Sequence, residues 1–367
     1  MLEAPPKQYD NAAKILVERK GARAGFVLNR PKVLNALDDD MRKILTDEIQ
    51  RIARNPDIYV VVLSSASAKA FCAGGDVRAL VAEAKRDMAR TRQYFANEYQ
   101  LDWLLDCFSK PTVSLIDGIC MGSGAGLTSF NTHRVAGENY KWAMPETAIG
   151  LFPDVGIAHV LARMPWPMGL YLGLTGRGVN RADAYWLGLA THCISSAHYE
   201  NIQALLSDAE PIDPLLDNLH ETLGVGPLQR ELGLITEFFS RSSIEEIVAS
   251  LKNAHGAAKS WADASLADLM TRSPMSLKIT DRHIRGARAL DLRQTLIQDY
   301  RLAWRCLKAP DFAEGVRAAL IDKDASPKWS PPSLDHVTPE MVQAYLAPLG
   351  ADELVLLSRE EMQAARS

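Results

Sequence analysis

The sequence predicts an α/β core followed by a mainly helical C-terminal region. A continuous apolar run at residues 59–63 and a second strand-like segment at residues 112–116 are each followed by a glycine-rich turn and a segment that can form a helix. Strand-like and helix-like segments alternate to about residue 195, which is typical of an α/β layer. Beyond about residue 207 the segments are successively helical. We therefore divide the chain into a core, residues 1–206, and a C-terminal region, residues 207–367.

The first elements are a hairpin and an amphipathic helix. Residues 15–18 and 25–28 are β-type runs separated by a turn-rich stretch. After a loop over residues 29–37, Asp38 precedes apolar residues with helical spacing that end near the Asn-Pro pair at 55–56. The strand at 59–63 then leads through Gly74 and Gly75 into a polar helical stretch that reaches about residue 108.

The second half of the core repeats this order. A strand at 112–116 precedes a glycine-rich turn at 118–126, further strands at 134–136 and 141–143, and helices at 156–164 and 168–174. The C-terminal region predicts helices that include 244–251, 262–270 and 290–307. The proline-rich stretch 326–332 predicts an extended connector before a short terminal helical segment.

Composition excludes several classes of function. The 41 basic and 45 acidic residues give a net charge of −4 without blocks of like charge, so no electrostatic footprint for nucleic acid or a membrane surface is present. The five cysteines are scattered without CxxC spacing, which argues against a disulfide framework and a metal site. Without a signal peptide or a long apolar run, we expect a cytoplasmic protein.

The glycine-rich turns are candidate sources of backbone hydrogen-bond donors. Gly74 and Gly75 precede one helical segment, and Gly122, Gly124 and Gly126 precede another. Glycine lets the main chain approach a ligand, and free N–H groups at a helix start can stabilise an oxygen that gains negative charge. Close packing of strand-to-helix turns is the alternative, and spacing does not choose between them. The glycines do not follow GxGxxG spacing, which disfavours a dinucleotide site.

Two carboxylates are the candidate acid–base residues. Glu146 and Asp154 lie eight residues apart in an apolar stretch that contains two prolines. Desolvation and mutual repulsion can separate the pKa values of such a pair, so that one acts as an acid and the other as a base. The alternative is that both residues lie at helix N-termini as caps or first-turn acids, and spacing alone favours it.

Other residues are weaker candidates. His133, His159 and His192 have no second ligand at helical spacing, and Cys72 and Cys120 are expected to be small buried thiols. Arg30 and Lys32 flank Pro31 and could contact a phosphate, although two cations in a loop usually face water.

Together these segments resemble the crotonase (enoyl-CoA hydratase/isomerase) superfamily and, within it, the 3-hydroxyisobutyryl-CoA hydrolase family. The resemblance covers nearly the whole chain and is carried by residues 29–37, 71–76, 110–126, 143–156, 174–176, 273–280 and 312–329. It implies a spiral of ββα turns that forms two roughly perpendicular sheets, with a helical C-terminal region that covers the site.

The resemblance also implies roles for individual residues. The backbone amides of Gly75 and Ser123 would form an oxyanion hole, although the family usually has glycine in place of Ser123. Glu146 and Asp154 would be catalytic. Six residues would bind coenzyme A: Arg30, Lys32, Val33, Leu34, Ala73 and Asp76.

The implied activity is hydrolysis of a short 3-hydroxyacyl-CoA thioester, such as the 3-hydroxyisobutyryl-CoA of valine catabolism. Hydratases of the superfamily need a second glutamate where this chain has Gly126, whereas the hydrolase pair is matched by Glu146 and Asp154. Glu146 would activate water or attack the carbonyl itself, and both routes stay open. No cofactor is expected, since coenzyme A is part of the acyl-CoA substrate, and a homo-oligomer is left open.

Two alternatives accompany this prediction. An enoyl-CoA isomerase or hydratase-type enzyme of the same superfamily is the first, because an isomerase needs only one base, which Glu146 could supply. A coenzyme A-binding homologue without turnover is the second. Release of coenzyme A from a hydroxyacyl-CoA would separate these classes.

Overall fold

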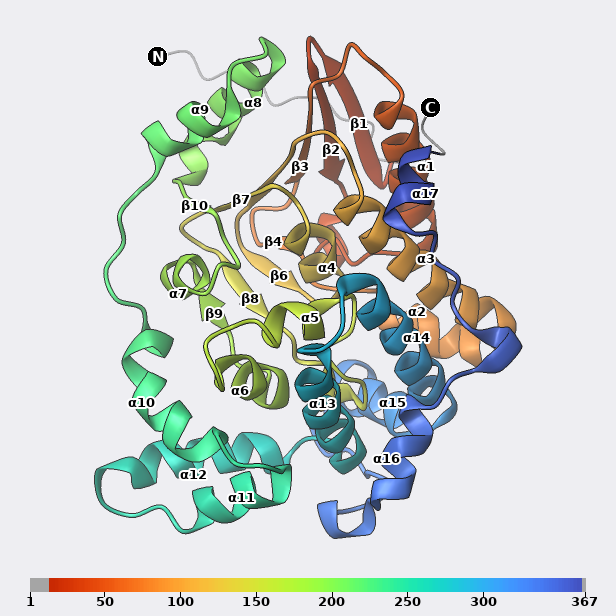
Figure 1. Ribbon diagram of the computed structural model, residues 1–367, viewed down its shortest axis with the longest axis vertical. Coiled ribbons are helices and arrows are strands. Elements are labelled where there is room, and N and C mark those ends of the chain that lie inside the picture. Colours follow the sequence, from red (N-terminus) through yellow and green to blue (C-terminus); the bar gives the residue numbers. More distant parts are fainter. Residues whose placement is uncertain (1–12, 365–367) are drawn as a thin grey trace.

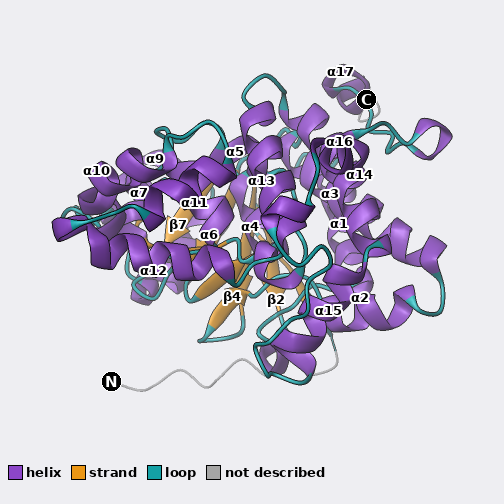
Figure 2. Ribbon diagram, turned by 90° about the horizontal axis from the view of Figure 1, so that it is seen from below, coloured by secondary structure: helices purple, strands orange, loops and turns teal. Residues whose placement is uncertain are grey.

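Two β-sheets form the centre of the protein, and helices surround them (Figures 1 and 2). The computed structural model describes residues 13–364. The larger sheet has the strand order β1 (Ile15–Lys20), β2 (Arg23–Leu28), β3 (Val60–Ser65), β5 (Thr112–Ile116), β7 (His133–Ala136) and β10 (His192–Cys193). The smaller sheet has the order β4 (Ala70–Cys72), β6 (Ile119–Met121), β8 (Lys141–Ala143) and β9 (Val179–Asn180).

The chain alternates between the two sheets. After the antiparallel β1–β2 hairpin, β3, β5 and β7 enter the larger sheet in parallel, and each is followed by a strand of the smaller sheet, β4, β6 and β8. Helices follow each such pair, which confirms the expected spiral of ββα turns. Strands β4 and β6 were not predicted from the sequence, because they are only three residues long and border glycine-rich turns.

Helix α1 (Asp39–Ala53) forms for the reasons predicted. The Asp38 side chain accepts a hydrogen bond from the Met41 backbone N–H at 3.1 Å, which satisfies one of the free donors of the first turn. Leu45, Ile49 and Ile52 share one face of the helix and are fully buried. This burial fixes α1, and with it the loop that precedes the helix.

The predicted polar helix before residue 108 is two helices, α2 (Val77–Ala84) and α3 (Met88–Asp106). The Asp87 side chain accepts a hydrogen bond from the Arg90 N–H at 3.0 Å and so starts α3 afresh. The predicted helix at 156–164 is shorter, since α5 spans only Ile157–Leu161. The remaining helices of the core are α4 (Ser123–Ser129), α6 (Met168–Thr175), α7 (Arg181–Trp186) and α8 (Tyr199–Ser207).

The C-terminal region is helical, as expected. Its helices are α9 (Ile212–Leu219), α10 (Pro227–Phe239), α11 (Ile244–Lys252), α12 (Lys259–Met270), α13 (Pro274–Ala287), α14 (Leu292–Lys308), α15 (Pro310–Val316), α16 (Pro339–Leu346) and α17 (Arg359–Ala364). Helix α14 packs on α3, and α15 packs on α2 and on the 3₁₀ helix Glu146–Ile149 (Figure 1). These contacts bring the end of the chain to the first half of the core.

The predicted division at residues 206/207 stays a prediction. Helix α9, on the C-terminal side of that boundary, packs with α8 against one face of the larger sheet, where Leu216 belongs to the same hydrophobic cluster as Val62 and Leu115. The main hydrophobic cluster also holds residues from both sides of the boundary. Within residues 13–364, no helix is long and apolar enough to cross a membrane.

Candidate active site

A cavity of about 310 Å³ lies where the two glycine-rich turns meet the C-terminal region. Gly75, Ser123, Glu146 and Asp154 all line it, so the structure brings the four predicted catalytic and oxyanion-hole residues together. The lining also includes Leu320, from a π-helix at Arg317–Ile321 that follows α15. The predicted core alone therefore does not enclose this cavity.

The two glycine-rich turns pack directly against each other. Gly74 has φ of 113° and Gly122 has φ of 50°, conformations that favour glycine. A Cβ atom added at Gly122 would lie 3.3 Å from the Gly74 Cα and 3.0 Å from Glu146 Oε1. The structure therefore shows the close packing that was one of the two interpretations of these glycines. The same packing places the neighbouring residues Gly75 and Ser123 at the cavity wall.

The amides of Gly75 and Ser123 are the candidate oxyanion-hole donors. Among residues 13–364, neither N–H has a hydrogen-bond acceptor. The two residues are adjacent in space, because a Cβ atom added at Gly75 would lie 3.1 Å from Ser123 Oγ. Two free donors on one cavity wall can receive an oxygen that becomes negative during a reaction.

Glu146 presents a carboxyl group to the cavity in an apolar setting. It is the first residue of the 3₁₀ helix that follows β8, and only 8% of its surface is exposed. Its Oε2 has no hydrogen-bond partner among the described residues. Burial raises the pKa of Glu146 to about 8. The carboxyl group can therefore take up and release a proton near neutral pH.

Asp154 is held by a hydroxyl group. The Tyr99 hydroxyl donates a hydrogen bond to Asp154 Oδ2 at 2.8 Å. Burial, followed by the negative charges of Glu98 and Glu146, raises the pKa of Asp154 well above its usual value. The residue that caps α5 is Gly156 and not Asp154. The capping alternative therefore does not describe the Asp154 side chain.

Sequence reasoning missed the charged and hydroxyl groups that α3 adds to this site. Tyr94 and Glu98 line the cavity, and Glu98 forms an ion pair of 2.8 Å with the buried Arg42. The spacing of Tyr94 and Glu98, four residues apart, places them on one helix face. The four-residue spacing could have indicated that Tyr94 and Glu98 act together. It was not used, because a glutamate in a polar helix normally lies on a face exposed to solvent.

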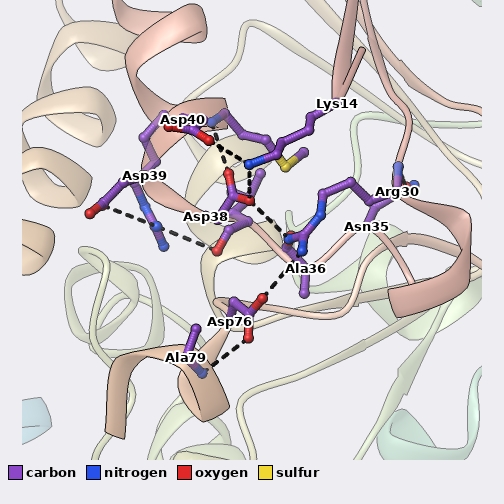
Figure 3. Close-up of polar contacts among 12 residues, drawn as sticks. Lys14, Arg30, Asn35, Ala36, Asp38, Asp39, Asp40, Asp76 and Ala79 are labelled. Carbon is purple, nitrogen blue, oxygen red and sulfur yellow. Dashed lines mark hydrogen bonds and ion pairs between the residues drawn. The ribbon is translucent and has the colours of Figure 1, made fainter. Parts of the chain in front are cut away.

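The predicted coenzyme A-binding loop is fixed by Arg30. Its guanidinium donates to the Ala36 carbonyl at 2.6 Å and forms ion pairs with Asp38 at 3.4 Å and Asp76 at 3.3 Å (Figure 3). Asp76 also accepts a hydrogen bond from the Ala79 N–H at the start of α2 (Figure 3). The side chain of Arg30 thus links the starts of α1 and α2.

The other predicted coenzyme A-binding residues gather beside Arg30. Lys32 and Val33 are exposed and line, with Arg30, a second cavity of about 480 Å³. The Leu34 carbonyl accepts a hydrogen bond from the Ala73 N–H at 3.0 Å, which joins this loop to the first glycine-rich turn. Their role in binding coenzyme A stays a prediction.

The weaker candidates lie outside the cavity. Burial raises the pKa values of the Cys72 and Cys120 thiols to about 12, which disfavours the thiolate needed for nucleophilic attack. His133 and His192 pair with aspartates of α9. Within residues 13–364, no group of three or more histidine, cysteine or acidic side chains is arranged to hold a metal ion.

The two-sheet spiral and its cavity can be compared with those of known protein families. A model of the enoyl-CoA hydratase/isomerase family matches residues 24–346. The chain therefore belongs to that family, within the crotonase superfamily, and it is an acyl-CoA enzyme of that superfamily.

Relatives with assigned names span almost the whole chain. The chain is 39% identical to the mitochondrial 3-hydroxyisobutyryl-CoA hydrolase of Gallus gallus, over 95% of this chain and 93% of the relative. It is 38% identical to the human mitochondrial protein of the same name, over 95% and 92%. It is 38% identical to 3-hydroxyisobutyryl-CoA hydrolase 1 of Arabidopsis thaliana, over 96% of each. The cytoplasmic location of this chain stays a prediction.

Two solved structures share the fold. A carnitinyl-CoA dehydratase from Mycobacterium thermoresistibile is 34% identical, has a TM-score of 0.87 and covers 93% of this chain and 98% of its own. An enoyl-CoA hydratase from Rhodobacter sphaeroides is 33% identical, has a TM-score of 0.87 and covers 94% and 100%. These matches confirm the α/β crotonase fold.

Proposed function

We propose that the protein hydrolyses 3-hydroxyisobutyryl-CoA, or a similarly short 3-hydroxyacyl-CoA thioester, to the free acid and coenzyme A. The observation that carries this proposal is the meeting of two acidic side chains, Glu146 and Asp154, with the two free amides of Gly75 and Ser123 at one cavity. The names of relatives at 38–39% identity support the choice of substrate.

Hydrolysis of the thioester proceeds through a negatively charged oxygen. The carbonyl oxygen accepts hydrogen bonds from the Gly75 and Ser123 amides, which stabilise the charge that forms on it. In one route ionised Glu146 removes a proton from the attacking water, and in the other its carboxylate bonds to the carbonyl carbon. In both routes the tetrahedral intermediate collapses, the carbon–sulfur bond breaks, and the thiolate of coenzyme A leaves and takes up a proton. The first route gives the free acid directly, whereas the second gives a mixed anhydride that water then hydrolyses to the free acid and the Glu146 carboxylate. Asp154, oriented by Tyr99, positions the water and passes this proton.

A hydratase-type reaction is the second candidate, favoured by the names of the two similar structures. Addition of water to a double bond needs both activation of water and protonation of carbon, and the superfamily resemblance assigns the second carboxylate to the position of Gly126. The space beside Gly126 is filled by Val155 and Asp102. This crowding favours the hydrolase over the hydratase.

The experiment that tests the proposal measures release of coenzyme A from 3-hydroxyisobutyryl-CoA with a thiol reagent. We expect turnover by the wild-type protein and its collapse in Glu146→Gln, which keeps the shape of the side chain but removes its charge. Asp154→Asn should slow turnover by about 10²- to 10⁴-fold, the usual range for acid–base assistance. Glu200→Gln, at an exposed position of α8, is the matched control.

The hydratase, isomerase and non-catalytic alternatives each predict a different result when the same protein samples are assayed. Loss of enoyl absorbance from crotonyl-CoA at a rate comparable to thiol release would establish the hydratase, and a shift of the double bond would establish the isomerase. Binding of the thioester without release of coenzyme A or a change in the double bond would identify a non-catalytic protein. Near-normal turnover by folded Glu146→Gln would rule out its catalytic role.

A further inference from the structure

Arg42, in α1, is a buried cation behind the cavity wall, with only 1% of its surface exposed. Its Nη2 donates to the Tyr94 hydroxyl at 2.7 Å and to Glu98 Oε1 at 2.8 Å, and lies 3.4 Å from Ser123 Oγ. Its Cζ lies 3.9 Å from the centre of the Tyr94 ring. The guanidinium thus contacts the second glycine-rich turn through the Ser123 side chain.

Arg42 also contacts the segment that holds the first turn. Its Nη1 donates to the Leu37 carbonyl at 3.4 Å. That carbonyl accepts a hydrogen bond from the Asp76 N–H at 2.9 Å, while the Leu37 N–H donates to the Gly74 carbonyl at 2.8 Å. Leu37 therefore holds the peptide groups on both sides of Gly75, and Arg42 holds Leu37.

The guanidinium lies close to the Gly75 backbone itself. A Cβ atom added at Gly75 would lie 2.5 Å from the Tyr94 hydroxyl, 3.1 Å from Ser123 Oγ and 3.4 Å from Arg42 Nη2. Three polar groups thus converge on the backbone of one predicted donor, and one of the three is cationic. In an interior where charges are weakly screened, such a cation favours negative charge that develops beside it.

The ion pair with Glu98 is not explained by stability alone. Transferring two charges from water to the interior costs about as much as their attraction returns, and apolar replacements of similar volume are often neutral or stabilising. Glu98 itself lines the cavity, so the pair forms part of the site. These contacts indicate a functional role for Arg42.

We propose that Arg42 is the positioning residue of the oxyanion hole: it holds the Gly75 segment through Leu37 and places a positive charge behind the Gly75 and Ser123 amides, while Glu98 and Tyr94 fix its guanidinium. This inference rests on the proposed hydrolase function for its kinetic consequence. It does not require Arg42 to contact the substrate.

The experiment compares Arg42→Met and Arg42→Lys with Arg23→Met. Arg23 is a matched control, because it is 3% exposed and its ion pair with Glu18 lies on the β1–β2 hairpin. We expect Arg42→Met to lose about 10²- to 10³-fold in kcat, as is typical for loss of an oxyanion-stabilising group, with KM changed by less than about threefold. Arg42→Lys should recover part of kcat, because a lysine restores the charge but not the planar fork.

A spectroscopic measurement separates positioning from folding. Cinnamoyl-CoA absorbs at longer wavelength when its carbonyl group is polarised, so its difference spectrum on binding reports on the oxyanion hole without turnover. We expect a red shift with the wild type and Arg23→Met, a smaller shift with Arg42→Lys and almost none with Arg42→Met. Circular dichroism must show that each variant is folded. If Arg42→Met does not fold, the kcat and the red shift of Arg42→Lys test the role of Arg42.

The outcomes distinguish this inference from the proposed function. Folded Arg42 variants with wild-type kcat and a full red shift would overturn the role of Arg42, whatever the substrate. An equal kinetic loss in Arg23→Met would assign the effect to buried ion pairs in general and would overturn it too. A wild-type protein that polarises cinnamoyl-CoA but releases no coenzyme A would contradict only the proposed hydrolase.

Discussion

A Cβ atom added at Gly126 would lie 2.9 Å from Oδ1 of Asp102, a residue of α3 that is almost fully buried. The same atom would lie 2.7 Å from the Val155 Cβ. Burial, followed by the charges of Glu98 and Asp154, raises the pKa of Asp102 well above its usual value. The space beside Gly126 is therefore filled by a buried acidic side chain and an aliphatic side chain.

This crowding predicts that Gly126→Glu does not create a hydratase. The variant should lose at least about 2 kcal/mol of unfolding free energy, because overpacking typically costs about 1–3 kcal/mol and a buried carboxylate adds to that cost. Denaturant unfolding and crotonyl-CoA absorbance are the measurements. Gly233→Ala, in α10 with no atom within 4 Å of the added Cβ, is the control and should be neutral or slightly stabilising. A stable Gly126→Glu protein that hydrates crotonyl-CoA would contradict this account.

Glu146→Gln should stabilise the protein increasingly as the pH rises. The pKa of Glu146 is about 8 in the folded protein, above the ordinary value of 4.5 that applies to the unfolded chain. Between these values the unfolded chain releases a proton that the folded protein keeps, so the wild type loses stability as the pH rises. A glutamine at this position does not ionise and escapes that loss.

The measurement is the unfolding free energy of both proteins at about pH 5 and about pH 9. We expect the advantage of Glu146→Gln to grow by at least about 1 kcal/mol, since one pKa unit corresponds to about 1.4 kcal/mol. The exposed Glu200→Gln variant should show no such growth. A helix-capping role for Glu146 predicts instead a loss of about 0.5–2 kcal/mol on substitution.

The activity of the proposed hydrolase should rise with pH through the pKa of Glu146. Burial keeps this carboxyl protonated at neutral pH, with a pKa of about 8, whereas the base or nucleophile must be ionised. We expect kcat/KM for 3-hydroxyisobutyryl-CoA to be half-maximal near pH 8 and to level off about one pH unit above that. A profile that falls over the same range would show that the protonated form of Glu146 is the active one.

Ser123 should act through its amide and only slightly through its hydroxyl. Ser123→Ala removes the Oγ that lies 3.4 Å from Arg42 Nη2, a long contact, so kcat should fall by less than about tenfold. Ser123→Pro removes the N–H at the first position of α4, where proline fits the helix, and should cost about 10²- to 10³-fold in kcat. A hundredfold loss in a well-folded Ser123→Ala would assign the function to the hydroxyl.

Most of the architecture could be predicted from local sequence patterns and from the resemblance to a known family. The apolar face of α1 and the Asp38 cap, for example, depend on residues that are close together in the sequence. Strands β4 and β6 were missed because three residues carry no recognisable period. Asp87, which divides the predicted polar helix in two, is a local signal that could have been used.

The electrostatic part of the site could not be predicted in the same way. Arg42 and Glu98 meet across 56 positions of sequence, and each lies in a helix where a charged residue normally faces water. Tyr99 reaches Asp154 across 55 positions. Such partners follow from how α1 and α3 pack, whereas Glu146 and Asp154 could be suspected from their apolar neighbours alone.

Leu320 adds to the cavity lining a part that is synthesised after both glycine-rich turns. The Leu320 carbonyl accepts a hydrogen bond from Arg78 of α2 at 2.6 Å, so the cavity is completed by a residue that leaves the ribosome long after both glycine-rich turns. A nascent chain that already carries Gly75, Glu146 and Asp154 has an unfinished pocket open to water. A chain that ends before Leu320 would keep Glu146 and Asp154 but would lack this part of the cavity lining.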